Sequence, residues 1–133
     1  QNKIINNNIR SLNNIKIIEK TDDIKSIYEK TKMLLIPSIV DETFSMVCLE
    51  AGANGIPVIS TSCGNLKYLN KDIGGIIIYD YNNIDKWCDE INKLLSNEER
   101  FNYVSKESRK NSFIVYNPEE QYKKFFSIIK NLK

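Results

Sequence analysis

The sequence predicts an α/β fold built on a doubly wound, Rossmann-like parallel sheet. Short runs of β-forming residues alternate along the chain with segments whose apolar residues recur at helical spacing. Two of these runs, 33–36 and 76–79, are continuously apolar, which is typical of strands covered on both faces. The length of 133 residues allows one domain with a single core and argues against two independent domains.

Four segments are predicted to be strands, and turn-forming residues mark their limits. Pro37 stops the second strand, Gly55 precedes the third, and a pair of glycines at 74–75 precedes the fourth. The predicted strands are 15–18, 33–36, 58–60 and 76–79.

Five helices are predicted, most of them with a recognisable cap. An Asp of the pair 22–23 caps the first, an Asn of the pair 82–83 caps the third, and Pro118 stands in the first turn of the last. Gly55 ends the second helix. The predicted helices, to within a residue at their starts, are 23–30, 45–54, 83–95, 97–110 and 118–131, and a short element of undefined type lies between the third and fourth strands.

Two of these helices carry apolar stripes that we assign to packing. In the helix at 83–95 the residues expected to face inward are Ile84, Trp87, Cys88, Ile91, Leu94 and Leu95. In the last helix Tyr122, Phe125, Phe126 and Ile129 form a stripe that is expected to pack in the core or against another domain.

The charge and the missing histidines exclude several functions. The chain has 19 Lys+Arg against 17 Asp+Glu, so a net charge of +2 gives no electrostatic case for binding nucleic acid or an anionic membrane. With no His, the chain itself cannot supply a Ser-His pair, a His-ligated zinc or an imidazole proton relay. We expect no transmembrane segment, because no apolar run approaches the roughly 18 residues that span a bilayer.

The three cysteines are Cys48, Cys63 and Cys88, and they form neither a CxxC pair nor a metal-binding spacing. We therefore expect reduced thiols and a cytoplasmic location. No metal ligands are predicted.

The segment most informative about function is 37–57. Ligands of doubly wound sheets bind beyond the carboxyl ends of the strands, which here are followed by the loops 19–23, 37–45, 60–66 and 79–83. The loop at 37–45 leads directly into a helix that opens near Ser45, and Ser45, or Thr43 before it, can serve as its N-cap. Free backbone N–H groups at such a helix start favour an anion, phosphate above all. The chain contains neither a GxGxxG nor a GxxxxGK[ST] motif, which argues against a dinucleotide fingerprint or a P-loop.

Two carboxylates frame this helix start, Glu42 in the loop and Glu50 on the helix, with seven residues between them. The vicinal hydroxyls of a ribose would give Glu50 two hydrogen-bond donors. The residues alone leave open that Glu42 is an acid favoured by the helix dipole and that Glu50 is a solvated helix position.

In its wider context this segment resembles the family 4 glycosyltransferases (glycosyl transferases group 1) of GT-B fold, in their C-terminal, nucleotide-sugar-binding domain. The matching pattern is a strand ending in Pro37-Ser38, then Glu42-x7-Glu50, then Ala51-x3-Gly55-x-Pro57-Val58-Ile59. The resemblance continues through Gly64 and the terminal helices and covers nearly the whole chain.

The resemblance implies a transferase that moves a sugar from a nucleotide-diphosphate sugar to an acceptor, with retention of configuration and without a metal or other cofactor. It implies that Glu42 is catalytic, that the loop after it holds the donor sugar, that amides at the helix start hold the diphosphate, that Glu50 binds the ribose and that the loop at 19–21 lies near the base. The full set of implied substrate-binding residues is Glu19, Lys20, Thr21, Ser38, Thr43, Phe44, Ser45, Met46, Val47, Glu50 and Gly64.

The sequence also departs from the family pattern. The usual Gly-Phe-Gly after the first Glu is Thr43-Phe44-Ser45 here, and the added Cβ atoms narrow the approach to a hexose. The first strand-helix-strand of the family domain, with a basic clamp for the diphosphate, and the acceptor domain do not appear in residues 1–133. In a sheet of order 3-2-1-4-5-6, this separates the strand at 15–18 from the one at 33–36.

We therefore expect the missing parts to come from a longer parent protein or an oligomeric partner, or the sheet to be rearranged, and the isolated chain to be inactive. The alternative is a non-catalytic nucleotide-sugar-binding or interaction module with a degenerate GT-B fold. A related GT-B epimerase or phosphorylase is a third, unsupported possibility. The donor base, the sugar and the acceptor are not specified by the sequence.

Overall fold

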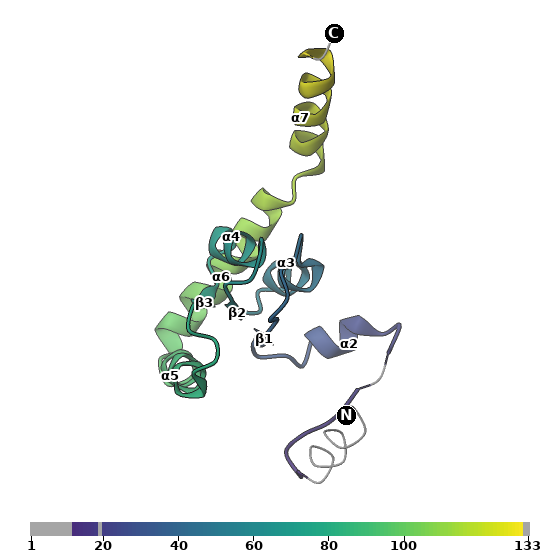
Figure 1. Ribbon diagram of the computed structural model, residues 1–133. Helices are drawn as coiled ribbons and strands as arrows, with labels where there is room; N and C mark the ends of the chain where they lie inside the picture. Colours follow the sequence, from purple (N-terminus) through teal and green to yellow (C-terminus); the bar gives the residue numbers. More distant parts are fainter. Residues whose placement is uncertain (1–11, 19, 132–133) are drawn as a thin grey trace.

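The computed structural model describes residues 12–18 and 20–131 (Figure 1). Its centre is a parallel sheet with strand order β1-β2-β3, formed by Leu34–Ile36, Val58–Thr61 and Ile76–Ile78. The register aligns Leu35 with Ile59 and Ile59 with Ile76. The predicted α/β class with a parallel sheet is confirmed.

Helices alternate with these strands and then complete the chain. The helices are α2 (Ile24–Tyr28), α3 (Met46–Ala53), α4 (Leu66–Asp72), α5 (Ile84–Leu95), α6 (Glu98–Val115) and α7 (Pro118–Asn131). Two predicted caps are confirmed, because the side chain of Asp23 accepts from the Ser26 N–H and that of Asn83 from the Asp85 N–H. The element left undefined by the sequence is α4, and α6 continues beyond the predicted end at 110.

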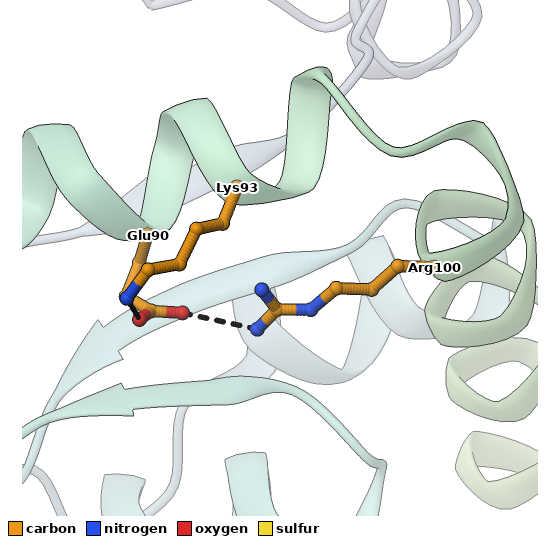
Figure 2. Close-up of polar contacts among 3 residues, drawn as sticks. All are labelled: Glu90, Lys93 and Arg100. Atoms are coloured by element: carbon orange, nitrogen blue, oxygen red, sulfur yellow. Dashed lines mark hydrogen bonds and ion pairs between the residues drawn. The ribbon is translucent and has the colours of Figure 1, made fainter.

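Each face of the sheet has its own apolar cluster. On one face the fully buried Val58 packs with residues of α3 and α4, such as Leu49 and Leu66. On the other face its neighbour Ile59 packs with Leu94 of α5 and Val104 of α6, among others. Neighbouring residues of one strand therefore support opposite layers, as the alternation of side chains along a strand requires. The Glu90 carboxylate of α5 also binds Arg100 of α6 (Figure 2).

The predicted strand at 15–18 is wrong. This segment has no strand conformation, and Ile15, Ile17 and Ile18 are 43%, 39% and 51% exposed. A strand is stabilised by hydrogen bonds to a neighbour, and in the described part of the chain β1 is the edge of the sheet with no strand beside this run. The β-forming residues of this segment are therefore not enough to make it a strand.

The predicted apolar stripes are correct only in part. In α5, Trp87, Ile91 and Leu94 pack inward, and the indole N–H of Trp87 donates to the carbonyl of Tyr81 at 3.0 Å. Ile84, Cys88 and Leu95 are exposed instead, because they lie along one flank of the helix at 100° per residue. In α7 the whole stripe is exposed (Tyr122, Phe125, Phe126 and Ile129), so it belongs to no core within the described residues. Figure 1 shows α7 leading away from the sheet.

Candidate functional site

Two loops that follow neighbouring strands are joined at the carboxyl end of the sheet. The backbone of Glu42, after β1, forms a parallel bridge with Gly64, after β2. Asn65 strengthens the connection, since its N–H donates to the Glu42 carbonyl at 2.8 Å and its side-chain amide donates to the Thr43 carbonyl at 3.0 Å. The Thr61 hydroxyl donates to the Ser38 carbonyl at 2.6 Å. The predicted residues of both loops therefore lie together.

Gly64 allows these loops to approach each other. Its φ of +56° lies in the left-handed region, which side chains disfavour. A Cβ atom at this position would also stand 2.6 Å from both the backbone N and the backbone O of Glu42. Gly64 is thus required by the backbone around Glu42, and the structure gives it this supporting role.

Glu42 is half-buried and receives a hydrogen bond from the Ser38 hydroxyl, which connects two of the predicted residues. Its charge also acts on the first turn of α3. Burial, together with the negative charge of Glu42, raises the pKa of the Cys48 thiol to about 12. Cys48 is therefore a neutral, packed thiol at physiological pH.

The start of α3 has no side-chain cap. Ser45 stands at the N-cap position, but its side chain makes no capping hydrogen bond, contrary to the role that the sequence suggested for it. Its hydroxyl is buried, the residue being 3% exposed, and has no hydrogen-bond partner among the described residues. The first N–H groups of a helix have no partner within it. This helix start therefore has backbone amides without a side-chain cap, beside a buried hydroxyl that has no partner among the described residues.

Around this helix start the other predicted contact residues are accessible. Phe44 is 50% exposed, and Met46 and Val47, which would contribute backbone amides, are 51% and 41% exposed. Thr43 is also exposed. These four residues are thus at the surface, where a ligand could reach them.

Glu50 lies one turn further along α3 and is exposed. Its carboxylate accepts a hydrogen bond of 2.8 Å from the hydroxyl of Tyr28, which belongs to α2. Burial, helped by this hydrogen bond and by the charge of Glu50, raises the pKa of Tyr28 to about 12. Sequence reasoning missed Tyr28, although a tyrosine on an apolar helical stripe needs a partner for its hydroxyl.

The loop predicted to lie near the base is not joined to this cluster. Lys20 and Thr21 are exposed, and the Thr21 hydroxyl accepts from the nearby Asp23 N–H at 3.1 Å. Within the described residues neither one hydrogen-bonds to the loop at 37–45. Glu19 lies outside the described residues. The assignment of 19–21 to the base stays a prediction.

The described residues contain no cluster of three or more His, Cys, Asp or Glu side chains placed to share a metal ion. Across the same residues, every helix is too short or too polar to cross a membrane.

The fold and the site together define an α/β domain of Rossmann type, with its candidate site at the carboxyl ends of the strands, where such sheets bind ligands. The profile of one family, described as Glycosyl transferases group 1, matches residues 5–111. The chain belongs to this family, and its fold is that of a partial GT-B C-terminal domain.

The chain is also similar to individual proteins. Spore coat protein SA of Bacillus subtilis (strain 168) is 32% identical over 92 residues, which are 68% of this chain and 24% of that protein. Sucrose-phosphate synthase from Thermosynechococcus elongatus has a similar fold, with a TM-score of 0.77 at 20% identity, over 98% of this chain and 34% of that one. The C-terminal domain of a glycosyl transferase group 1 family protein from Francisella tularensis matches 86% of this chain and 61% of its own, with a TM-score of 0.64 and 18% identity.

Proposed function

We propose that the protein transfers a sugar from a nucleoside-diphosphate sugar to an acceptor, with retention of anomeric configuration and without a metal ion. In this proposal the chain supplies the donor-binding half of the site. The observation that carries it is the start of α3, which lies in sequence between Glu42 and Glu50. It has no side-chain cap, and the buried hydroxyl of Ser45 beside it has no partner among the described residues. Because the chain spans 24% of the Bacillus relative's length, the activity of the whole protein is part of the proposal.

The diphosphate would bind at the start of α3. Its negative charge is favoured by the positive end of the helix dipole and by N–H groups without an intrahelical partner. The Ser45 side chain would turn outward so that its hydroxyl, buried and without a partner among the described residues, donates to a phosphate oxygen. These donors would also stabilise the charge that develops on the leaving diphosphate.

Glu42 would act next to the anomeric carbon. In the transfer, the bond between this carbon and the diphosphate oxygen breaks, and the oxygen keeps the electron pair. The acceptor hydroxyl forms the new bond to the same carbon, and its proton passes to the departing diphosphate oxygen, the base that the reaction itself generates. A carboxylate stabilises the positive charge at the anomeric carbon, and the hydrogen bond from Ser38 would fix its orientation. Retention rests on membership of the family.

The surface beside this site favours a covering partner. Ile39, Val40 and Phe44 are 75%, 71% and 50% exposed in the loop at 37–45. We propose that an acceptor-binding domain, or an oligomeric partner, covers these apolar side chains during the reaction. We further propose a cytoplasmic location, which is supported by the three free cysteines.

A specific observation favours one alternative, a non-catalytic module that binds nucleotide sugars. The loop after Glu42 has Thr43 and Ser45 where the family pattern has glycines. Such a module would bind the donor but transfer no sugar. A binding test and a transfer test therefore distinguish the two functions.

The binding test is calorimetry of the intact protein with UDP, GDP, ADP and CDP, each in turn. We expect one of them to bind and Glu50→Ala to weaken its affinity about tenfold or more, because the ribose hydroxyls lose a charged acceptor. Glu98→Ala, which removes an exposed glutamate from the start of α6, is the matched control and should leave the affinity unchanged. Equal affinities for the unmodified protein and Glu50→Ala would contradict the ribose assignment.

The transfer test uses Glu42→Ala in the intact protein, with release of the nucleoside diphosphate from the sugar donor that binds as the readout. We expect donor binding to persist and release to fall at least a hundredfold, because the anomeric carbon loses its carboxylate. If the unmodified protein binds the donor and releases nothing in the presence of a range of acceptors, the non-catalytic alternative is correct.

A further inference from the structure

The structure connects α2 to the candidate site through one aromatic residue. Tyr28 is the last residue of α2, and it packs against the apolar cluster that includes Cys48 and Leu49 of α3. The ring is half-buried, while the hydroxyl reaches Glu50 on the outer side of that cluster. Packing therefore fixes the position of the ring, and the ring fixes the position of its hydroxyl.

The hydrogen bond from Tyr28 restrains a side chain that is otherwise exposed. Tyr28 Oη lies 2.8 Å from Glu50 Oε2. Glu50 forms no ion pair within the described residues, and Oε1 has no hydrogen bond there. An exposed glutamate on a helix samples several rotamers, and ordering it for a ligand is unfavourable. The tyrosine removes part of that conformational freedom before a ligand arrives.

The direction of the hydrogen bond preserves the acceptor capacity of Glu50. The Tyr28 hydroxyl, with its pKa of about 12, is protonated at neutral pH and donates the hydrogen bond to the Glu50 carboxylate. An ionised carboxylate has about four acceptor positions, and the tyrosine occupies one of them. Two hydroxyls on adjacent carbons can still be accepted.

We propose that Tyr28 is a positioning residue that orients the Glu50 carboxylate for the ribose hydroxyls of the donor. The inference rests on the proposed function, since it needs a nucleotide at this site. It adds a residue of α2, outside the Glu42-x7-Glu50 segment, to the determinants of donor affinity. It also predicts that Tyr28 strengthens the binding only of nucleotides that have ribose hydroxyls.

The test is Tyr28→Phe in the intact protein, because phenylalanine keeps the packed ring and removes only the hydroxyl. Calorimetry is done with whichever of UDP, GDP, ADP and CDP binds, and with its 2′,3′-dideoxy analogue. We expect Tyr28→Phe to weaken binding of the ribonucleotide about three- to tenfold and to leave binding of the dideoxy analogue unchanged. In a Glu50→Ala background the same substitution should have no effect, since the tyrosine hydroxyl has lost its acceptor.

Controls separate this role from a purely structural one. Tyr103→Phe, which alters an exposed tyrosine of α6, should leave both affinities unchanged. Equal weakening of the ribonucleotide and the dideoxy analogue by Tyr28→Phe would overturn the positioning role, since it would indicate a general loss of structure. If Glu50→Ala weakens binding of the ribonucleotide while Tyr28→Phe does not, the positioning role is overturned and the proposed function stands. If the unmodified protein binds none of the four nucleotides, both are overturned.

Discussion

Cys48 is fully buried where α3 meets the sheet, and it links the chemistry of the site to the stability of the core. Its Sγ lies 3.8 Å from Asn70 Oδ1, and Asn70 in turn donates to the Ser60 hydroxyl and to the Ile76 carbonyl, both at 2.8 Å. One buried amide therefore connects α3, α4 and two strands. A thiolate at Cys48 would be desolvated and would stand close to the charge of Glu42.

This environment predicts a loss of stability at alkaline pH. The pKa of Cys48 is about 12 in the folded protein, against 9.0 as its ordinary value. Between these values the unfolded chain loses the proton while the folded chain keeps it, so the stabilisation present below pH 9 is lost as the pH rises toward 12. At pH 10.5 the effect is about 2 kcal/mol.

Urea unfolding at pH 8 and at pH 10.5 measures this effect. Cys48→Ser, which removes the titrating thiol at similar size, should reduce the loss of unfolding free energy between the two values. Cys88→Ser is the matched control, because Cys88 is exposed, and it should behave like the unmodified protein. The explanation would be wrong if Cys48→Ser lost as much stability as the unmodified protein.

At the scale of elements, α5 and α6 are joined by a small network of charges (Figure 2). Glu90 of α5 pairs with Lys93 on the same helix at 2.8 Å and with Arg100 of α6 at 3.0 Å. The hydrogen bond from Lys93, opposed in part by burial and then supported by Arg100, lowers the pKa of Glu90. The contribution of this carboxylate to stability is therefore present above its ordinary pKa and is lost as the pH falls.

We predict that the Glu90–Arg100 pair contributes about 0.5–1 kcal/mol, the upper part of the range for partly exposed ion pairs. A double-mutant cycle of Glu90→Gln and Arg100→Met, with unfolding free energies from urea titrations at pH 7, gives the coupling. Lys86 and Asp80 form the control pair, because both side chains are more than half exposed (55% and 54%), and their cycle should give a coupling near zero. Equal couplings for the two pairs would contradict the prediction.

The elements that local signals specify could be predicted from the sequence. Asp23 and Asn83 cap the helices expected of them, because a capping hydrogen bond spans only two or three residues. The strand at 15–18 could not be excluded in the same way, since its formation depends on a neighbouring strand and not on its own β-branched residues. The prediction for Ser45 was correct in part. Ser45 is at the N-cap position of α3, but its hydroxyl makes no capping hydrogen bond.

At the scale of the whole molecule, the site is assembled by contacts that no short motif specifies. The hydrogen bond between Tyr28 and Glu50, and that from Asn65 to the Thr43 carbonyl, each join residues 22 positions apart. The parallel order of β1 and β2 could be predicted, and with it the meeting of the loops that contain Glu42 and Gly64. Which side chains complete the cluster depends on how α2 and α4 pack, and only the folded chain determines that.

The last helix, α7, is not part of the packed domain. No residue of α7 is buried, and its aromatic rings contact one another, with 4.5 Å between the ring centroids of Tyr122 and Phe126. In α6, by contrast, Val104, Ser108 and Ser112 are buried. A helix of 14 residues without tertiary packing is marginally stable in water. The domain should therefore fold without α7 but not without α6.

Ending the chain after Asn117 should change the free energy of unfolding by less than about 0.5 kcal/mol, because every described side chain that it removes is exposed. Urea unfolding followed by tryptophan fluorescence measures this, since Trp87 lies in α5 beneath α6. Ending the chain after Ser96 is the matched comparison and should abolish cooperative unfolding, because it also removes the buried residues of α6. A large loss of stability after removal of α7 alone would mean that its aromatic stripe packs against the domain, and the prediction would then be wrong.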